Sequence, residues 1–497
     1  MQRVRGLETE YGLQLRVRPA DAANPAGWRR LSSDEAAQQL FAPVVEANAA
    51  SNVYLRNGGR LYLDVGSHPE YATAECSTLT ELLAQDRAGD LIIARLAERA
   101  RESLAQQGYQ ARISIFKNNV DSHGNSYGSH ENFQVARSGE LNQLVEALMP
   151  FLVTRQLLCG AGHWERDQLG RGHFQISQRA AHMWDPLSSA TTHSRPMVNT
   201  RDEPHADAQR FRRLHVIVGD STMLEPTTLL RLGSMELVLR ALEDSPSETR
   251  PRSPSGTQSR FPSLSRGPAR GIREPGRVIR EVAGDLTGRC PVADDGASAL
   301  DIQRELWELT TPFADDDELR QAHELWGRVL DAIQDRALER VETEIDWVAK
   351  RRLLLAQRER HGMTDDDPRL AQLDLAWHDI VTGQGLARVA EARGQVRRVL
   401  PDCAAEHAVD EPPGTTRAVL RARFVAAAQR HRREYTVDWM KFSCHDLTDG
   451  AVSVQNPLCT ADRRVEEIVA RMASEPRRAG SAGFTAARHS WSPSDLG

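Results

Sequence analysis

The sequence predicts an α+β fold, in which a large sheet is combined with long helices. Short segments of alternating apolar and polar residues fill positions 3–75. Between two of them, Asn57-Gly58-Gly59 is typical of a tight hairpin, because glycine supplies the positive φ that such a turn needs. Residues 79–106 show the apolar stripe of a long amphipathic helix. With 497 residues, 40% of them hydrophobic, the chain can bury the core of one large domain and one or two smaller units.

The first half of the chain mixes strands and helices without a regular βαβ repeat. The helix after the first strand begins at the capping sequence Ser33-Asp34-Glu35. The strands expected from alternation lie at 4–15, 53–55, 61–65, 112–117 and 214–218. The helices expected from 3-4 spacing lie at 33–45, 79–106 and 229–242.

The residue pattern in the second half of the sequence indicates a change of domain. Residues 244–276 are rich in Pro, Ser and Arg and lack apolar periodicity, so we expect a disordered or mobile insert. Helical spacing returns at 325–355 and 370–380, and Asp410-Glu411-Pro412-Pro413 then interrupts it. The expected organisation is a main domain over 1–405, a small C-terminal α/β domain over 412–473 with a helix at 417–429 and a strand at 435–442, and a disordered tail over 474–497.

Composition narrows the possible partners. Lys and Arg total 63 against 69 Asp and Glu, so the net charge of -6 leaves no excess of positive charge for a nucleic-acid backbone. The six cysteines lack CxxC spacing, which argues against a zinc site and against a disulfide framework. No apolar run reaches 18 residues and the start of the chain lacks a signal-peptide pattern. We therefore expect a cytoplasmic protein that binds neither nucleic acid nor membrane.

Two carboxylates on one strand give the first candidate site. In Gly6–Gly12 (GLETEYG), strand alternation places Glu8 and Glu10 on one face and Leu7, Thr9 and Tyr11 on the other. Close like charges repel unless a cation lies between them, and hard oxygen ligands favour Mg²⁺. A solvated sheet face is the alternative interpretation.

The segment 60–75 (RLYLDVGSHPEYATAE) gives the second candidate. Leu61, Leu63 and Val65 are expected to face the core, which places Arg60, Tyr62 and Asp64 together on the opposite face. The turn at 66–69 then returns a second acidic strand, with Glu70 and Glu75, to the same neighbourhood. A salt-bridged sheet exterior would explain the alternation equally well, but not this return.

Two further polar segments could bind a ligand. The Gly-punctuated loop 116–132 contains many donors and acceptors, although the same residues also form ordinary turns. In the run 192–205, Arg195 and Arg201 are the best candidates for phosphate, because a guanidinium pairs with oxygens through two bonds and stays charged. The sequence has no GxxxxGK[ST] loop, so a site for ATP would be of another type.

Taken together, these segments resemble a known family. Gly6–Gly12, 51–76, Lys117-Asn118-Asn119, 199–207 (NTRDEPHAD) and Thr436-Val437-Asp438-Trp439 are similar to the Pup–protein ligases, which are ATP-dependent carboxylate–amine ligases related to glutamine synthetase. The resemblance spans about residues 1–473. It implies a large antiparallel sheet with flanking helices and a small C-terminal domain.

The resemblance also implies a reaction and its partners. ATP would phosphorylate the γ-carboxylate of the C-terminal glutamate of Pup, and a lysine of a target protein would attack the acyl phosphate to form an isopeptide bond that marks the target for the proteasome. By motif, Glu8, Tyr62 and Glu70 correspond to magnesium ligands, with Glu10 as a further candidate. Arg60, Thr73 and Trp439 correspond to ATP contacts, and Asp64 to the general base for the lysine amine. Strict alternation from Glu70 would point Thr73 to the other face, so a bend after Pro69 is needed.

Two rival functions remain. A Pup deamidase or depupylase shares the fold, but that sister family typically has Gly-Thr-Glu-Val-Glu-Tyr-Gly at the start and a long loop soon after it, whereas Leu7 and Thr9 occupy those positions here. A Pup-binding scaffold without activity would not need Glu8, Tyr62, Asp64 and Glu70 together. Both comparisons favour the ligase.

Overall fold

The computed structural model of the chain describes residues 2–21, 27–64, 66–121, 124–137, 140–167, 169–189, 195–244, 271–381 and 383–477. Val65 and most of the predicted insert and tail lie outside these ranges. Eight strands form the main sheet, in the order β11-β12-β13-β8-β1-β6-β5-β4. Their bounds are β1 Arg5–Glu10, β4 Val53–Tyr54, β5 Arg60–Leu63, β6 Pro69–Ala72, β8 Ser129–Ala136, β11 Met183–Ser188, β12 Arg195–Asn199 and β13 Phe211–Val216.

The pairing within the main sheet is antiparallel except at one edge. β1 lies between β6 and β8 and pairs antiparallel with both, and the expected Asn57–Gly59 hairpin joins β4 to β5 with Gly58 at φ +80°. At the other edge, β11 and β12 run parallel. The sheet is therefore mixed rather than wholly antiparallel.

After β1 the chain leaves the main sheet and enters a smaller sheet of three strands. Its strands are β2 Gly12–Pro19, β3 Arg29–Arg30 and β7 Tyr109–Phe116, in the order β3-β2-β7. Tyr11 separates β1 from β2, because its N–H donates to the carbonyl of Pro69 and the chain then pairs with β7. A two-stranded ribbon is made by β9 His163–Arg166 and β10 Gly172–Gln175.

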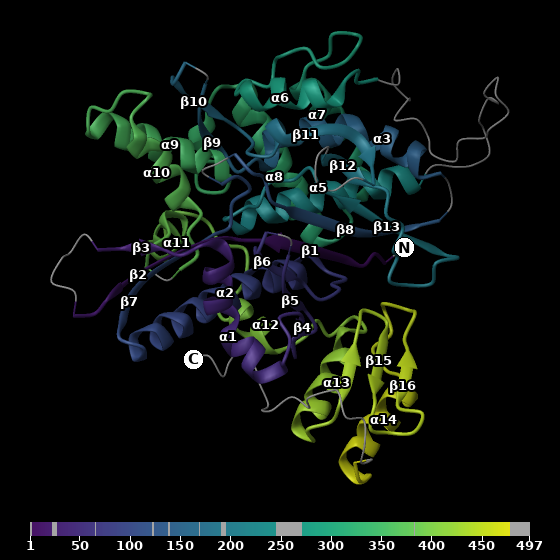
Figure 1. Cartoon of the computed structure of the whole chain (residues 1–497). Helices are drawn as coiled ribbons and strands as arrows, with labels where there is room; N and C mark the ends of the chain where they lie inside the picture. Colours follow the sequence, from purple (N-terminus) through teal and green to yellow (C-terminus); the bar gives the residue numbers. More distant parts are fainter. Residues whose placement is uncertain are drawn as a thin grey trace.

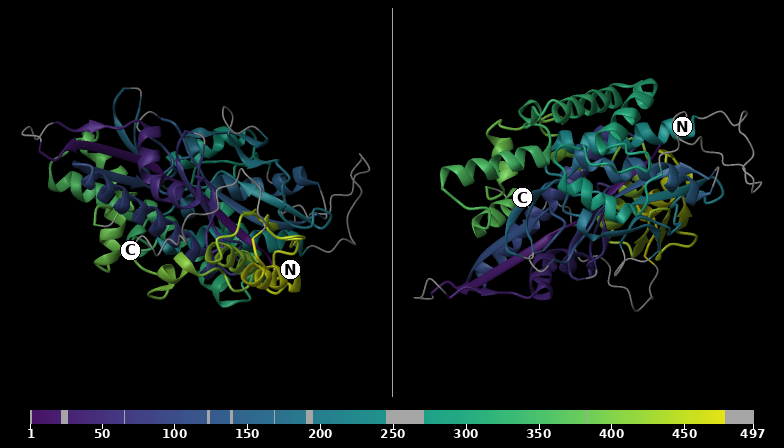
Figure 2. Two further views of the ribbon diagram at one scale, coloured as in Figure 1. Left: turned by 60° about the horizontal axis from the view of Figure 1, so that its bottom comes forward. Right: turned by 90° about the horizontal axis from the view of Figure 1, so that it is seen from above.

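Helices pack on the sheets and on one another (Figures 1 and 2). α2, which has the predicted bounds Leu79–Gln106, packs against β1, β6 and β7. The side chains of Leu7 and Tyr11 are buried beneath it. No helix in the described ranges is long and apolar enough to cross a membrane. The other helices before residue 411 are α1 Ser33–Asn48, α3 Leu141–Thr154, α4 Gln156–Cys159, α5 Glu225–Glu243, α6 Pro275–Gly284, α7 Ala299–Thr310, α8 Asp317–Gln334, α9 Asp346–Arg360, α10 Pro368–Trp377, α11 Leu386–Ala392 and α12 Ala404–Asp410.

The end of the chain forms its own hydrophobic cluster beside β4 and β5 (Figure 1, lower right). It consists of α13 Ala418–Arg430, β14 Tyr435–Val437, β15 Lys441–Cys444, β16 Ala451–Ser453 and α14 Arg463–Ser474. Phe424 and Phe442 are fully buried at its centre. The domain boundary between 405 and 412 stays a prediction, and α12 next to it packs against α2.

Three of the expected elements are wrong in their extent, and the first is the strand expected at 4–15, which Tyr11 divides into β1 and β2. The helix expected at 325–355 is two helices, because α8 ends before Arg336, which adopts a left-handed φ of +57°, and α9 begins only at Asp346. The strand expected at 435–442 is interrupted at 438–440, because the Asp438 carboxylate accepts hydrogen bonds from the N–H groups of Met440 and Lys441, both at 2.7 Å. Trp439 therefore lies on a turn.

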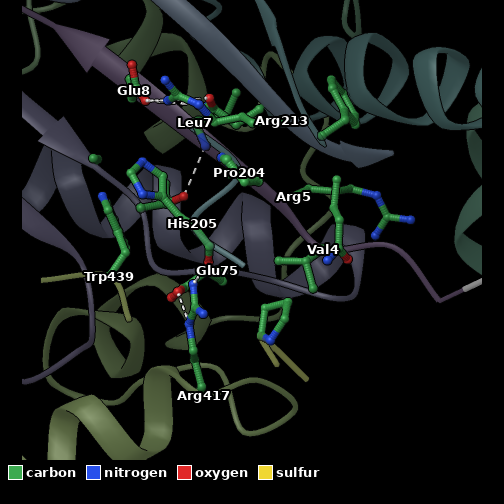
Figure 3. Close-up of a pocket in the computed structure, with 17 residues that line it drawn as sticks. Val4, Arg5, Leu7, Glu8, Glu75, Pro204, His205, Arg213, Arg417 and Trp439 are labelled. Atoms are coloured by element: carbon green, nitrogen blue, oxygen red, sulfur yellow. Dashed lines mark hydrogen bonds and ion pairs between the residues drawn. The ribbon is translucent and has the colours of Figure 1, made fainter. Parts of the chain in front are cut away.

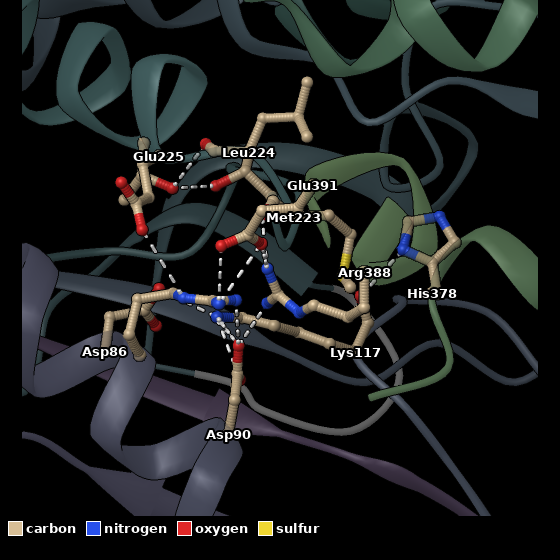
Figure 4. Close-up of polar contacts among 12 residues, drawn as sticks. Asp86, Asp90, Lys117, Met223, Leu224, Glu225, His378, Arg388 and Glu391 are labelled. Carbon is tan, nitrogen blue, oxygen red and sulfur yellow. Dashed lines mark hydrogen bonds and ion pairs between the residues drawn. The ribbon is translucent and has the colours of Figure 1, made fainter. Parts of the chain in front are cut away.

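A buried network of charges supports the sheet from the side of α2 (Figure 4). The Lys117 ammonium group lies 2.7 Å from Asp86 and 3.1 Å from Asp90, and Arg388 of α11 lies 2.6 Å from Asp90. The Tyr11 hydroxyl donates to Asp90 at 2.9 Å. Buried charges are tolerated when they are paired in this way, and the network fixes the point at which β1 passes into β2.

Candidate active site

The open face of the main sheet borders a cleft of about 1140 Å³. Strands β1, β5, β6, β8, β12 and β13 contribute to it, together with the turn between β14 and β15. All the predicted site residues line this cleft except Thr73: they are Glu8, Glu10, Arg60, Tyr62, Asp64, Glu70, Arg195, Arg201 and Trp439. Residues from both ends of the chain therefore meet at one place.

One acidic cluster consists of Glu10, Asp64 and Glu70, with one carboxylate oxygen of each within 4.8 Å of the others. Glu10 of β1 lies directly opposite Glu70 of β6, and Tyr62 of β5 lies opposite Glu70 on its other side. The Tyr62 hydroxyl donates a hydrogen bond to Glu70. Burial, followed by repulsion from Glu8 and Glu10, raises the pKa of Glu70 well above its ordinary value. A cation in this cluster would relieve that repulsion.

A second cluster surrounds Glu8 and adds residues that sequence reasoning left out of the site. Glu8, His130 and His215 each place one ligand atom within 4.8 Å of the others. His130 Nδ1 lies 3.3 Å and His215 Nε2 3.5 Å from Glu8 Oε2, while Arg213 Nη1 lies 3.4 Å from Glu8 Oε1. Burial alone raises the pKa of Glu8, but the attraction of His215 and the contact with His130 lower it well below its ordinary value. Glu8 is therefore ionised.

The second cluster also fits a cation. Neither ring nitrogen of His215 has a hydrogen-bond partner within the described residues, although both are buried. Burial lowers the pKa of His215, which favours the neutral ring, and a neutral imidazole offers a lone pair to a cation. Carboxylate and neutral imidazole are both established ligands of divalent cations.

Asp64 is held at the cleft by a turn. Its N–H donates to the His68 carbonyl at 2.9 Å, and its own carbonyl accepts from the N–H of Ser67 at 3.0 Å. Gly66 takes a φ of +90°, which only glycine adopts at low cost. The Ser67 hydroxyl donates to Asp34 at the start of α1. The Asp64 side chain is half-buried and borders the cleft.

A small cavity of about 90 Å³ adjoins the cleft beside the C-terminal unit (Figure 3). Thr73, Glu75, His205, Arg417 and Trp439 line it. The indole of Trp439 lies 6.2 Å from the ring of His205, centroid to centroid. Thr73 Oγ1 accepts a hydrogen bond from the N–H of Leu7 at 3.0 Å, so this hydroxyl still has its own hydrogen to donate.

The predicted arginines differ in how firmly they are held. The Arg60 guanidinium lies 4.5 Å from the ring centroid of Tyr62, and its Nε donates to Asn52 at 2.8 Å. Arg195 donates to the carbonyl of Ser126. Arg201 is exposed at the rim of the cleft. All three guanidinium groups therefore border the space in which a polyphosphate would lie.

The site residues that the sequence analysis left out are His130, Arg213 and His215, and strand alternation is the one signal that they share. Alternation along β8 puts His130 on one face, and alternation along β13 does the same for Arg213 and His215. The pairing of β1 with β8 then sets His130 directly opposite Glu8. That pairing joins segments 122 residues apart, so local pattern alone could not find it.

Comparison with known proteins agrees with this geometry. The Pup-ligase family matches residues 3–443. Pup–protein ligase 1 of Rhodococcus erythropolis is 48% identical over 478 residues, which is 95% of this chain and all of the relative. Pup–protein ligase of Saccharomonospora viridis is 47% identical over 94% of this chain and 99% of the relative.

Two solved structures are also similar. A complex between the prokaryotic ubiquitin-like protein Pup and its ligase PafA has a TM-score of 0.84 at 40% identity, over 95% of this chain and 92% of that one. The Pup ligase PafA in complex with ADP has a TM-score of 0.77 at 41% identity, over 91% and 96%. The sheet with carboxylates on its open face thus belongs to a protein of the ligase class. Within that class, the chain belongs to the Pup-ligase family.

Proposed function

We propose that this protein uses ATP to join the γ-carboxylate of the C-terminal glutamate of Pup to lysine side chains of target proteins. The observation that carries the proposal is the meeting of Glu10, Tyr62, Asp64 and Glu70 in one cleft of a Pup-ligase family member. The phosphorylated glutamate would be attacked by the lysine nitrogen at its acyl carbon, the C–N bond would form, and phosphate would leave with the C–O bonding electrons.

Asp64 is proposed as the general base. A protonated lysine has no lone pair, so a carboxylate beside it must accept a proton before or during attack. Asp64 is free for this role, because its turn is fixed through backbone hydrogen bonds and its carboxylate is half-buried at the cleft. Glu70 is less suited, since it already accepts a hydrogen bond from Tyr62.

Magnesium is proposed to lie between the carboxylates. Glu10 and Glu70 would hold one ion and Glu8 another, and His130 and His215 lie beside Glu8. Burial, followed by the charge of Glu70, raises the pKa of Tyr62, so its oxygen would join a cation only as a neutral ligand. Bound Mg²⁺ would neutralise the phosphate oxygens of ATP. Titration calorimetry should show weaker Mg²⁺ binding for Glu10→Gln and Glu70→Gln.

The nucleotide is proposed to bind across the two cavities. The small cavity next to Trp439 would take the base, which stacks well on an indole, and Thr73 could donate its hydroxyl hydrogen there. Arg60, Arg195 and Arg201 would contact the phosphates. We also propose a cytoplasmic location, which the six free cysteines support.

One assay separates the proposed function from its rivals. The purified protein is incubated with ATP, Mg²⁺, Pup ending in glutamate and a lysine-bearing protein. A covalent adduct that requires ATP supports ligation. Release of Pup from a preformed conjugate, without new adduct, would instead identify a depupylase, and Pup binding without either reaction would identify a scaffold.

A further inference from the structure

A row of three arginines crosses the small sheet outside the cleft. Arg16 of β2 lies directly opposite Arg30 of β3 on one side and directly opposite Arg112 of β7 on the other. Residues that are directly opposite in a sheet project from the same face. All three side chains are exposed. We call Arg16, Arg30 and Arg112 the arginine row.

The arginine row has no structural counter-charge. Within the described ranges, no carboxylate lies within 4.0 Å of any of its three guanidinium groups, whereas the neighbouring Arg29 lies 3.2 Å from Glu35. Like charges directly opposite one another destabilise a sheet. Among the described residues, the one side-chain contact that offsets this is with Trp28, whose ring centroid lies 4.4 Å from the Arg112 guanidinium. The fold alone therefore does not explain the row.

The arginine row lies on the face that carries the active-site carboxylates. Counting in twos from Glu8 and Glu10 across the break at Tyr11 reaches Arg16, while the side chains of Tyr11, Leu15 and Val17 are buried. In Figures 1 and 2 the three strands extend away from the C-terminal unit that carries Trp439. A chain that lies along this face thus passes from the cleft onto the row.

The chain connects the row to the Asp64 end of the cleft, although none of the three arginines lines the cleft itself. β3 leads within three residues into α1, whose first residue, Ser33, lines the cleft. The next residue, Asp34, accepts the hydrogen bond from Ser67 of the turn that carries Asp64. The nucleotide would occupy the opposite end, near Trp439. Because Asp64 is the proposed general base, the substrate that enters beside it is the target protein, whose lysine amine loses a proton.

We propose that the arginine row is the docking surface for an acidic patch on the target protein, next to the lysine that enters the cleft. The inference rests on the proposed function, because Asp64 defines the lysine end. A guanidinium pairs with carboxylates through parallel hydrogen bonds, and a fixed row of three selects clustered Asp and Glu. Complementary charge also speeds the encounter, and more so at low salt. The row would thereby favour lysines in acidic surroundings.

The test compares two triple variants with equal change of charge. Arg16→Gln/Arg30→Gln/Arg112→Gln removes the row. Arg99→Gln/Arg101→Gln/Arg320→Gln removes three exposed arginines elsewhere. The acceptors are two fluorescein-labelled peptides, each with one lysine, flanked by six glutamates in one and by six serines in the other.

Loss of the row should raise KM for the glutamate peptide about tenfold, because three exposed charge pairs are lost and each contributes modestly. The control variant should match the wild type, and kcat, KM for the serine peptide and KM for Pup should not change. The effect should shrink as salt rises. The thermal midpoint should not fall, since like-charge repulsion is removed.

Other outcomes would overturn the assignment. Equal KM values for the glutamate peptide in both triple variants would exclude the row as a docking surface. A rise in KM for Pup alone would assign the row to Pup, and lost binding of a single-stranded DNA oligonucleotide alone would assign it to nucleic acid. If the wild type conjugates neither peptide, the proposed function fails, and fluorescence anisotropy of the glutamate peptide still reports whether the row binds it.

Discussion

Asp64 and His68 close a tight turn, in which the N–H of Asp64 donates to the His68 carbonyl at 2.9 Å. The turn holds the Asp64 carboxylate at the cleft without using it. Asp64→Asn should therefore keep the turn and lose only the proton acceptor. We expect the rate of conjugation to fall about 10²- to 10⁴-fold, which is the usual contribution of a general base. Calorimetry should show ADP binding close to that of the wild type, and conjugation at the normal rate would remove Asp64 from this role.

His68 positions this turn through its ring. Its Nδ1 lies 3.1 Å from the Tyr11 carbonyl, which can only accept, and the ring stacks on Tyr127 with centroids 4.6 Å apart. In His68→Asn, the amide nitrogen takes roughly the place of Nδ1, whereas in His68→Gln it lies too far out. We expect His68→Asn to retain most of kcat and His68→Gln to lose about tenfold, with KM for ATP unchanged in both. Equal kcat for the two variants would count against this role.

Gly128 makes room for both carboxylate clusters. A Cβ on this residue would lie 2.6 Å from Glu10 Oε1 and closer still to the His130 ring. Gly128→Ala should displace both groups and weaken Mg²⁺ binding at least tenfold in titration calorimetry, since metal sites tolerate little misplacement. Gly414→Ala is the control, because a Cβ there meets no atom within 4 Å. Similar Mg²⁺ affinity in the two variants would show that neither cluster binds the ion.

Trp439 is expected to stack on the base of the nucleotide. Loss of a stacking partner costs about 1–3 kcal/mol, so Trp439→Ala should raise KM for ATP about tenfold or more, and Trp439→Phe less. kcat at saturating ATP should stay near that of the wild type. Trp184→Ala, at the exposed edge strand β11, serves as the control. If KM for ATP is the same in all variants, the base binds elsewhere.

Alternation predicted the faces of the site strands but not the grouping of their side chains. Glu8 and Glu10 were placed on one face, and Leu7 and Tyr11 are buried on the other as expected. The two glutamates nevertheless belong to different clusters, because β8 sets His130 opposite Glu8 and β6 sets Glu70 opposite Glu10. Register between distant strands decides this, and a local pattern does not contain it.

The position of Trp439 could not be predicted from a local pattern either, because this residue of the C-terminal unit lines a cleft formed mainly by the main sheet. Apolar periodicity suggested an uninterrupted strand over 435–442, and only the hydrogen bonds of Asp438 turn the chain so that the indole reaches the cleft. The resemblance to a family was needed to predict that this residue contacts the nucleotide. By contrast, the extent of α2 was predictable to the residue, because Thr78 and Glu81 form a capping box and the apolar stripe is long.

Glu75 joins the two units and should make stability depend on pH. Its carboxylate lies 2.8 Å from Arg417 and also contacts Arg421, both buried in α13 or at its start. Burial alone would raise the pKa of Glu75, but Arg421 and then Arg417 outweigh it and lower the pKa from 4.5 to about 2. A lowered pKa contributes stability that is complete above the unfolded value and is lost as the pH falls through the folded value. This lowering of the Glu75 pKa corresponds to about 3 kcal/mol of folding stability.

The free energy of unfolding of Glu75→Gln should therefore lie about 3 kcal/mol below that of the wild type at pH 7, and the difference should shrink by about 1.4 kcal/mol for each pH unit between 4.5 and 2. Urea unfolding at pH 7, 5 and 3.5 measures this difference directly. Glu102→Gln, which alters a glutamate with 61% of its side chain exposed, should show almost no difference at any of these values. A difference for Glu75→Gln that stays constant from pH 7 to 3.5 would mean that the pair with Arg417 and Arg421 contributes packing rather than charge.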